Sequence, residues 1–127
     1  MIIVLDASAA VSVVLDKDKT LIQPLLEADK IIAPVLFISE IGNVFLKYHQ
    51  FRDMKKSECL THIKNCLGLI TDFYNEQNLY EEAFSIAYKN KLSYYDALYL
   101  AIAVDMQGTL LTLDKKLRKI ASELKLS

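Results

Sequence analysis

The sequence predicts an α/β fold, a three-layer α/β/α sandwich with a short, mainly parallel central sheet. Short apolar segments rich in β-branched residues alternate with longer helical patterns, which is typical of parallel strands joined by helices. The strands are too short and too few for a closed barrel of eight. No repeat or shift in composition divides the 127 residues, so one domain is expected over residues 1–127.

In the first half of the chain, apolar runs and turn residues define two strands and three helices. The strands end at Asp6 and Pro34. Ser8 is expected near the cap of the first helix, and Pro24 marks a break or a late start in the second. The third helix has one narrow polar stripe, so we expect it to be nearly surrounded by protein. In order, the elements are a strand over Ile2–Leu5, helices over Ala9–Leu15 and Thr20–Ala28, a strand over Ile31–Ala33, and a helix over Val35–Tyr48.

The second half of the chain is expected to be mostly helical. Leu60, Ile63, Leu67 and Ile70 recur at helical spacing and predict one long amphipathic helix. Gly108 is expected to stop the most apolar helix. In order, the elements are a helix over Lys56–Phe73, a polar loop over Asn75–Asn78, helices over Tyr80–Lys89 and Ser93–Met106, a strand over Thr109–Leu113, and a last helix over Lys115–Leu124.

The composition excludes several classes of protein. With 53% hydrophobic residues, three Gly and two Pro, the chain is neither disordered nor collagen-like. No apolar run approaches the roughly 18 residues that span a bilayer, so no membrane association is expected. The apolar N-terminus meets Asp6 without a basic region, which is unlike a signal peptide. Cys59 and Cys66 are too far apart on one expected helix for a disulfide, which favours a reducing cytoplasm.

The net charge of −1 argues against a protein that binds nucleic acid by bulk electrostatics. The charge is unevenly distributed, because Lys115–Ser127 contains five basic residues and one acid. Such a segment can attract phosphate groups. On charge alone, however, the favoured interpretation is a solvated face of the last helix.

Four carboxylates occupy informative positions. Asp6 and Asp114 each follow directly after an expected strand, at the edge of a parallel sheet where ligands bind. If these strands are neighbours, about 4.8 Å apart, the two carboxylates would nearly touch. Glu40 lies on the polar stripe of an apolar helix, and Asp96 opens another. Acids directed at one point raise one another's pKa values, and a hard divalent cation would compensate their charge.

Each of these acids also has a purely structural interpretation. Asp6 and Asp114 can cap the helices that follow them, and Glu40 can be an ordinary solvated residue. Ser93 and Asp96 fit a capping box, with Ser93 as the cap and Asp96 reaching back. Position alone leaves both the metal site and the capping interpretation open.

Other chemistries find less support in the sequence. Three glycines leave no room for a phosphate-binding loop, and the two histidines fit no catalytic triad order. Cys59, His62 and Cys66 share a helix face, but a fourth zinc ligand is not apparent, and core packing explains buried cysteines better. The tyrosines at 94, 95 and 99 can stack on bases, although aromatic residues at helical spacing are more often core or interface.

Four motifs resemble those of PIN-domain ribonucleases, and most of all the VapC-type toxins of prokaryotic toxin–antitoxin pairs. They are Asp6-Ala7-Ser8, Ser39-Glu40-Ile41-Gly42-Asn43, the segment Ser93–Ala101, and Leu111-Thr112-Leu113-Asp114. The resemblance covers essentially the whole chain. It departs at Ala7, where the family commonly has Thr, Ser or Asn. The tail Leu124–Ser127 is short, so the usual last edge strand is expected to be absent or rudimentary.

The resemblance implies a metal-dependent endoribonuclease that hydrolyses RNA phosphodiester bonds with Mg²⁺ or Mn²⁺. Its catalytic and metal-binding acids would be Asp6, Glu40, Asp96 and Asp114, with Ser8, Thr112 and Asn43 in supporting positions. Glu40 would orient a metal-bound water or hold a second ion. RNA contact is expected from basic residues that flank the acids: Lys47, Arg52, Lys55, Lys56, Lys115, Lys116 and Arg118.

The resemblance also implies partners. Family members usually form homodimers, and a toxin of this type would pair with a small antitoxin protein whose segment blocks the cleft. Two rival interpretations remain. One is a catalytically inactive PIN-like module that binds RNA or a partner. The other is a receiver-type phosphoacceptor domain, which needs paired acids after the first strand where this chain has only Asp6.

Overall fold

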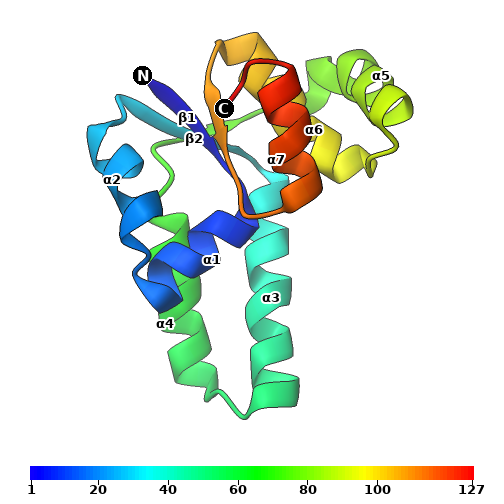
Figure 1. Cartoon of the computed structure of the whole chain (residues 1–127). Coiled ribbons are helices and arrows are strands. Elements are labelled where there is room, and N and C mark those ends of the chain that lie inside the picture. Colours follow the sequence, from blue (N-terminus) through cyan, green and yellow to red (C-terminus); the bar gives the residue numbers. More distant parts are fainter.

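The computed structural model describes residues 1–127 and contains one sheet of four strands, all parallel, in the order β3-β2-β1-β4 (Figure 1). The strands are β1 (Ile2–Leu5), β2 (Lys30–Pro34), β3 (Asp72–Tyr74) and β4 (Thr109–Leu111). The helices are α1 (Ala7–Asp16), α2 (Lys19–Glu27), α3 (Leu36–Arg52), α4 (Lys56–Leu67), the 3₁₀ turn η1 (Glu76–Leu79), α5 (Tyr80–Asn90), α6 (Tyr94–Met106) and α7 (Lys115–Glu123).

The sheet separates two buried clusters, because successive side chains of a strand point to opposite faces. Ile3 and Leu5 of β1 pack with α1, α2, α3 and α4 on one face. Val4 packs with α5, α6 and α7 on the other. Helices therefore cover both faces of a parallel sheet, and the predicted three-layer α/β/α sandwich is confirmed.

The strand β3 corrects one sequence prediction. The expected helix over Lys56–Phe73 ends at Leu67, and the chain then turns to form a fourth, edge strand. Thr71 begins the pairing: its amide donates to the carbonyl of Ile31 at 2.8 Å, and its hydroxyl accepts from the amide of Ile31 at 2.9 Å. The spacing of apolar residues could not reveal this, because the strand is defined by its pairing with β2.

The ends of β4 and α1 also differ from expectation. The expected strand Thr109–Leu113 ends at Leu111, so Asp114 lies three residues beyond the strand instead of directly after it. Asp6 is the cap of α1, and its side chain accepts a hydrogen bond from the amide of Ala9. The expected cap, Ser8, lies inside the first turn of that helix. Side-chain hydrogen bonds at this sheet edge set both boundaries.

The helix α3 is longer and more exposed than its sequence indicated. It continues to Arg52, past the expected end at Tyr48, and buries only Phe37, Ile41 and Phe45. In Figure 1, α3 and α4 project together beyond the sheet. The expectation that this helix is nearly surrounded by protein is wrong, because every residue after Phe45 is exposed except the half-buried Tyr48.

Smaller differences concern single turns. Pro24 lies inside α2, where burial of Leu21 and Leu25 holds the helix together despite the missing amide. The expected loop Asn75–Asn78 is largely the 3₁₀ turn η1. After α7 the chain forms no strand, although the Leu110 amide of β4 donates to the carbonyl of Leu126. None of the helices is long and apolar enough to cross a lipid bilayer.

Candidate metal centre

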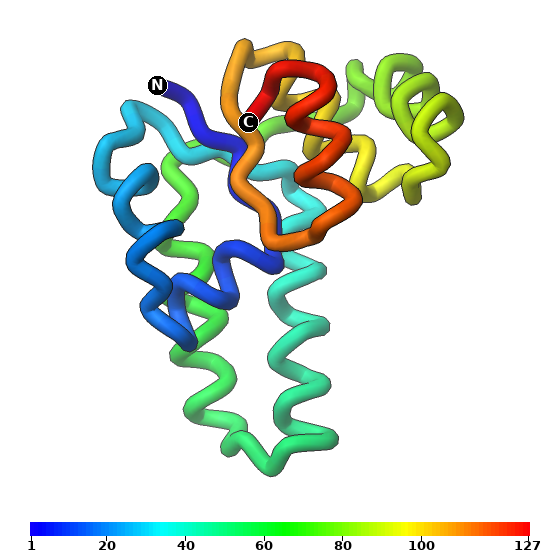
Figure 2. The backbone as a smooth tube through the Cα atoms, viewed as in Figure 1, coloured from blue at the N-terminus to red at the C-terminus, as the bar shows by residue number.

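The carboxyl ends of β1 and β4 lie side by side, next to the start of α3 (Figure 2). Asp6 follows β1 there and is only 6% exposed. Its Oδ1 accepts hydrogen bonds from the Ser8 hydroxyl at 2.8 Å and the Ala9 amide at 3.0 Å, and its Oδ2 accepts from the Thr112 hydroxyl. Burial nevertheless raises the pKa of Asp6, and the charge of Asp96 raises it further.

Thr112 links the two strand ends. Its hydroxyl donates to Asp6 and accepts from the amide of Asp114 at 3.1 Å. Asp114 itself caps α7, since its Oδ1 accepts from the Leu117 amide at 2.9 Å. Thr112 therefore contacts the Asp6 carboxylate directly, whereas the Asp114 carboxylate forms its hydrogen bond with the first turn of α7. Ser8 also links the two segments, because its hydroxyl accepts a hydrogen bond from the Leu113 amide at 3.1 Å.

Glu40 comes to this edge from the second turn of α3. The phenol of Tyr99, on α6, donates a hydrogen bond to its Oε1. Partial burial is the main cause that raises the pKa of Glu40, and the charges of Asp6 and Asp96 add to it. Tyr99 is 1% exposed, and burial followed by the charge of Glu40 raises its pKa above the ordinary range. The phenol thus stays protonated and available as a donor.

Asp96 stands in the first turn of α6, which Ser93 caps by accepting from the Asp96 amide at 3.1 Å. The predicted cap at Ser93 is confirmed. The pKa of the Asp96 carboxyl is raised by partial burial and then by the charge of Asp114, while the positive charge of Lys116 lowers it. Asp114 thus acts on Asp96, and Asp96 acts on Asp6 and Glu40.

The four acids form an electrostatic cluster without a cation of the protein in contact with any of them. The two salt bridges in the structure join Met1 to Asp29 and His62 to Glu58, and neither includes an acid of the cluster. No three Asp, Glu, His or Cys side chains form a group that could hold a metal ion in this arrangement. Mg²⁺ binds through one or two carboxylates and keeps several waters, so a hard divalent cation suits this set of oxygen donors in chemical type.

The basic residues expected to contact RNA fall into two groups. Lys115, Lys116 and Arg118 lie in the first turn of α7, directly after Asp114. Lys116 Nζ donates to the Lys91 carbonyl at 2.6 Å, and the Arg118 guanidinium donates to the Thr112 carbonyl at 3.1 Å. Lys115 makes no such bond and is exposed. This group lies at the acid cluster.

The second basic group extends from the second half of α3 to the start of α4 (Figure 1). Arg52 is about 18 Å beyond Glu40 along the helix, from the rise of 1.5 Å per residue. Its guanidinium lies over the ring of Tyr48, 4.9 Å from the centroid. Lys47 is exposed on the same helix, and Asn43 is exposed one turn beyond Glu40. The group consists of Lys47, Arg52, Lys55 and Lys56. The structure does not bring these residues to the acids.

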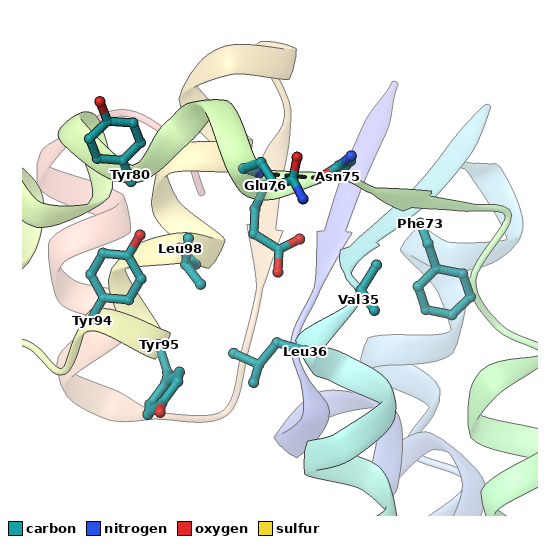
Figure 3. A pocket seen from close by; sticks show the side chains of 10 residues that line it. Val35, Leu36, Phe73, Asn75, Glu76, Tyr80, Tyr94, Tyr95 and Leu98 are labelled. Atoms are coloured by element: carbon teal, nitrogen blue, oxygen red, sulfur yellow. Dashed lines mark hydrogen bonds between the residues drawn. The ribbon is translucent and has the colours of Figure 1, made fainter.

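Beside the cluster lies a largely apolar pocket of about 690 Å³ between the start of α3, η1, α5 and α6 (Figure 3). Tyr94 and Tyr95 line this pocket, directly before Asp96 in the chain, and Glu76 points into it. Both tyrosines are exposed enough to meet a ligand. Tyr99, in contrast, is buried and hydrogen-bonded, so it cannot stack on a base. The role of Tyr99 was missed in the sequence because its partner is 59 residues away.

The cysteines behave as core residues. Both are buried free thiols, and burial raises the pKa of Cys66 to about 12. The ring of His62 stacks on Phe45 with centroids 5.5 Å apart. The Cys59 thiol donates to the Phe45 carbonyl at 3.4 Å. The packing interpretation of this helix face is therefore the one the structure supports.

Comparison with known proteins gives one family and a similar structure. The family model described as PIN domain matches residues 3–123. No curated protein matches the chain. Among solved structures, the crystal structure of PAE2754 from Pyrobaculum aerophilum is similar, with a TM-score of 0.75 and 25% sequence identity. The alignment covers 92% of this chain and 85% of that one.

Proposed function

The chain belongs to the PIN domain family, whose members are generally nucleases that use divalent metal ions, and from this premise we propose that it is a metal-dependent endoribonuclease acting on RNA phosphodiester bonds. The observation that supports this most is that Asp6, Glu40, Asp96 and Asp114 are linked electrostatically: the charge of Asp114 acts on Asp96, and that of Asp96 acts on Asp6 and Glu40. They come from four different parts of the fold, and no cation of the protein contacts them.

Asp6, Asp96 and Asp114 are our choices for direct or water-mediated contact with Mg²⁺ or Mn²⁺. Such a cation supplies Lewis-acid chemistry, because it acidifies water and offsets negative charge on phosphoryl oxygens. Glu40 would orient a metal-bound water or hold a second ion. Ser8 and Thr112 would keep the Asp6 carboxylate in place, since both donate to it. The exposed Asn43 completes the proposed supporting set.

For the RNA backbone we propose first the basic residues of α7. Lys115, Lys116 and Arg118 follow Asp114 directly, so phosphates beside the cleaved bond are within their range. Lys47, Arg52, Lys55 and Lys56 can assist only with a long substrate that extends along α3, given their distance from the acids.

More specifically, we propose that this protein is the toxin of a type II toxin–antitoxin pair of the VapC type. It would act in the cytoplasm as a homodimer, with a small antitoxin protein as its inhibitor. Large exposed apolar side chains support the existence of protein partners: on α3 alone, Leu46 is 50% and Phe51 is 78% exposed.

The experiment that tests the nuclease proposal is an RNA cleavage assay with the purified chain in Mg²⁺ or Mn²⁺, and again with EDTA. Cleavage that requires the metal, and that EDTA stops, supports the proposal. The alternative is a catalytically inactive PIN-like module that binds RNA or a partner. RNA binding without any cleavage would establish that alternative and end the nuclease proposal.

A further inference from the structure

Glu40 is held at the acid cluster by a single hydrogen bond. The donor is the Tyr99 phenol, and the structure shows no other hydrogen bond to the Glu40 carboxylate. Asp6 differs, because it accepts from the hydroxyls of Ser8 and Thr112 and from the amide of Ala9. The position of Glu40 therefore depends on Tyr99 far more than the position of Asp6 depends on any one donor.

This bond also connects the two sides of the sheet. Phe37 and Ile41, which flank Glu40 on α3, belong to the core on one face, while Tyr99 on α6 belongs to the core on the other. Tyr99 lies three residues after Asp96, so both are on the same face of α6. Asp6, Asp96 and Glu40 are all close enough to act on the phenol electrostatically. The phenol thus contacts one acid of the cluster and lies within electrostatic range of two others.

Without this donor, two effects would favour movement of the Glu40 side chain away from the other acids and into solvent. Its carboxylate is only partly buried, and the negative charges of Asp6 and Asp96 repel it. A glutamate side chain has several freely rotating bonds, and it gains conformational entropy when it swings into solvent. A fixed donor from a buried phenol opposes both tendencies.

We propose that Tyr99 is a positioning residue, whose hydroxyl holds Glu40 in the orientation that the cluster needs to bind a divalent cation. This inference rests on the proposed function in one respect, namely that the acid cluster binds a divalent cation. Residues that orient metal-binding side chains through a hydrogen bond typically change metal affinity by about 10- to 100-fold when they are replaced.

The test is the Tyr99→Phe variant, which keeps the buried ring and removes only the hydroxyl. We expect the dissociation constant for Mn²⁺, measured by isothermal titration calorimetry, to rise by about tenfold or more. The matched control is Tyr74→Phe. The phenol of Tyr74 also donates to a carboxylate, that of Asp105, but outside the cluster. This control should leave Mn²⁺ affinity unchanged.

A second pair of variants separates positioning from a general structural role. In the Glu40→Ala background, Tyr99→Phe should cause no further loss of Mn²⁺ affinity, because the carboxylate it positions is gone. An equal loss in both backgrounds would overturn the proposal. An unchanged Mn²⁺ affinity in Tyr99→Phe alone, or a failure of this variant to fold, would overturn it as well.

The outcomes for Tyr99 and for the nuclease activity are distinguishable. If the wild-type protein binds Mn²⁺ but cleaves no RNA, the nuclease proposal fails, and the calorimetry still decides the role of Tyr99. If metal-dependent cleavage is found and Tyr99→Phe binds Mn²⁺ as tightly as the wild type, only the role of Tyr99 fails. A wild-type protein that binds no Mn²⁺ overturns both.

Discussion

The hydroxyl of Thr112 donates a hydrogen bond to the carboxylate of Asp6, although the two residues are 106 positions apart in the chain. The same hydroxyl accepts from the amide of Asp114. One side chain thereby ties the end of β1 to the turn between β4 and α7. This pairing holds the buried Asp6 carboxylate in a fixed place and links it to the loop that presents Asp114.

We expect Thr112→Val to destabilise the protein by about 1–3 kcal/mol, because it removes a donor to a buried carboxylate and leaves the Asp114 amide without its acceptor. Valine has nearly the same shape as threonine, so packing should be little changed. The pKa of Asp6 should rise further, since the Thr112 bond now lowers it. Urea denaturation measures the first effect, and Thr112→Ser, which keeps the hydroxyl, should lose much less stability.

Asp6→Asn and Asp96→Asn should each lower metal-dependent RNA cleavage by about 100-fold or more while the fold is kept, because each removes a negative oxygen from the proposed metal site. Asparagine caps helices as well as aspartate does, so Asp6→Asn should still cap α1. Cleavage rates and circular dichroism spectra measure the two effects. Asp105→Asn is the control, since Asp105 is on the same helix as Asp96 and outside the cluster. Full activity in either cluster variant would remove that residue from the assignment.

The metal-free protein should lose stability through this cluster as the pH rises. Asp6, Glu40 and Asp96 have pKa values raised above their ordinary values of 3.8, 4.5 and 3.8. The folded state therefore binds these protons more tightly than the unfolded state, and the contribution favours folding below the ordinary values. It is lost as the pH rises through the higher folded-state values.

To measure this contribution, Asp96→Asn is compared with the wild type in urea with EDTA at pH 4 and pH 7.5. We expect the variant to be the more stable protein at pH 7.5 and the difference to shrink toward pH 4. Mn²⁺ should stabilise the wild type at pH 7.5 much more than it stabilises the variant. A pH-independent difference between the two proteins would contradict the raised pKa of Asp96.

Lys115→Ala should weaken the binding of a short single-stranded RNA and reduce the slope of log affinity against log salt by about 0.7, the value for one lost phosphate contact. Lys115 is exposed at the start of α7 beside Asp114. Lys55→Ala is the matched control and should leave both quantities unchanged, because Lys55 lies directly before α4, beyond the end of α3 that is away from the acids. Fluorescence anisotropy at several salt concentrations measures both. If both variants changed RNA affinity and its salt dependence equally, the RNA would not bind preferentially at the start of α7.

The failed prediction at β3 shows why some elements could not be found from the sequence. Leu67 and Ile70 keep helical spacing with the residues before them, so the local pattern favours a continued helix. The strand that forms instead has three residues, and its stability comes from the backbone of β2. A pattern of side chains carries no information about such a distant partner.

By itself, the sequence determined the parallel α/β sandwich, since short β-branched runs and long apolar helices have few other ways to bury their surfaces. It also singled out Asp6, Glu40, Asp96 and Asp114, because their joint pattern, at two expected strand ends and on two apolar helices, resembles the motifs of the PIN domain family. Only the tertiary structure decided that Thr112 contacts Asp6, that Tyr99 holds Glu40, and that the basic residues divide into a near and a far group. Hydrogen bonds between distant segments depend on where helices and strands pack, and packing is a property of the whole chain.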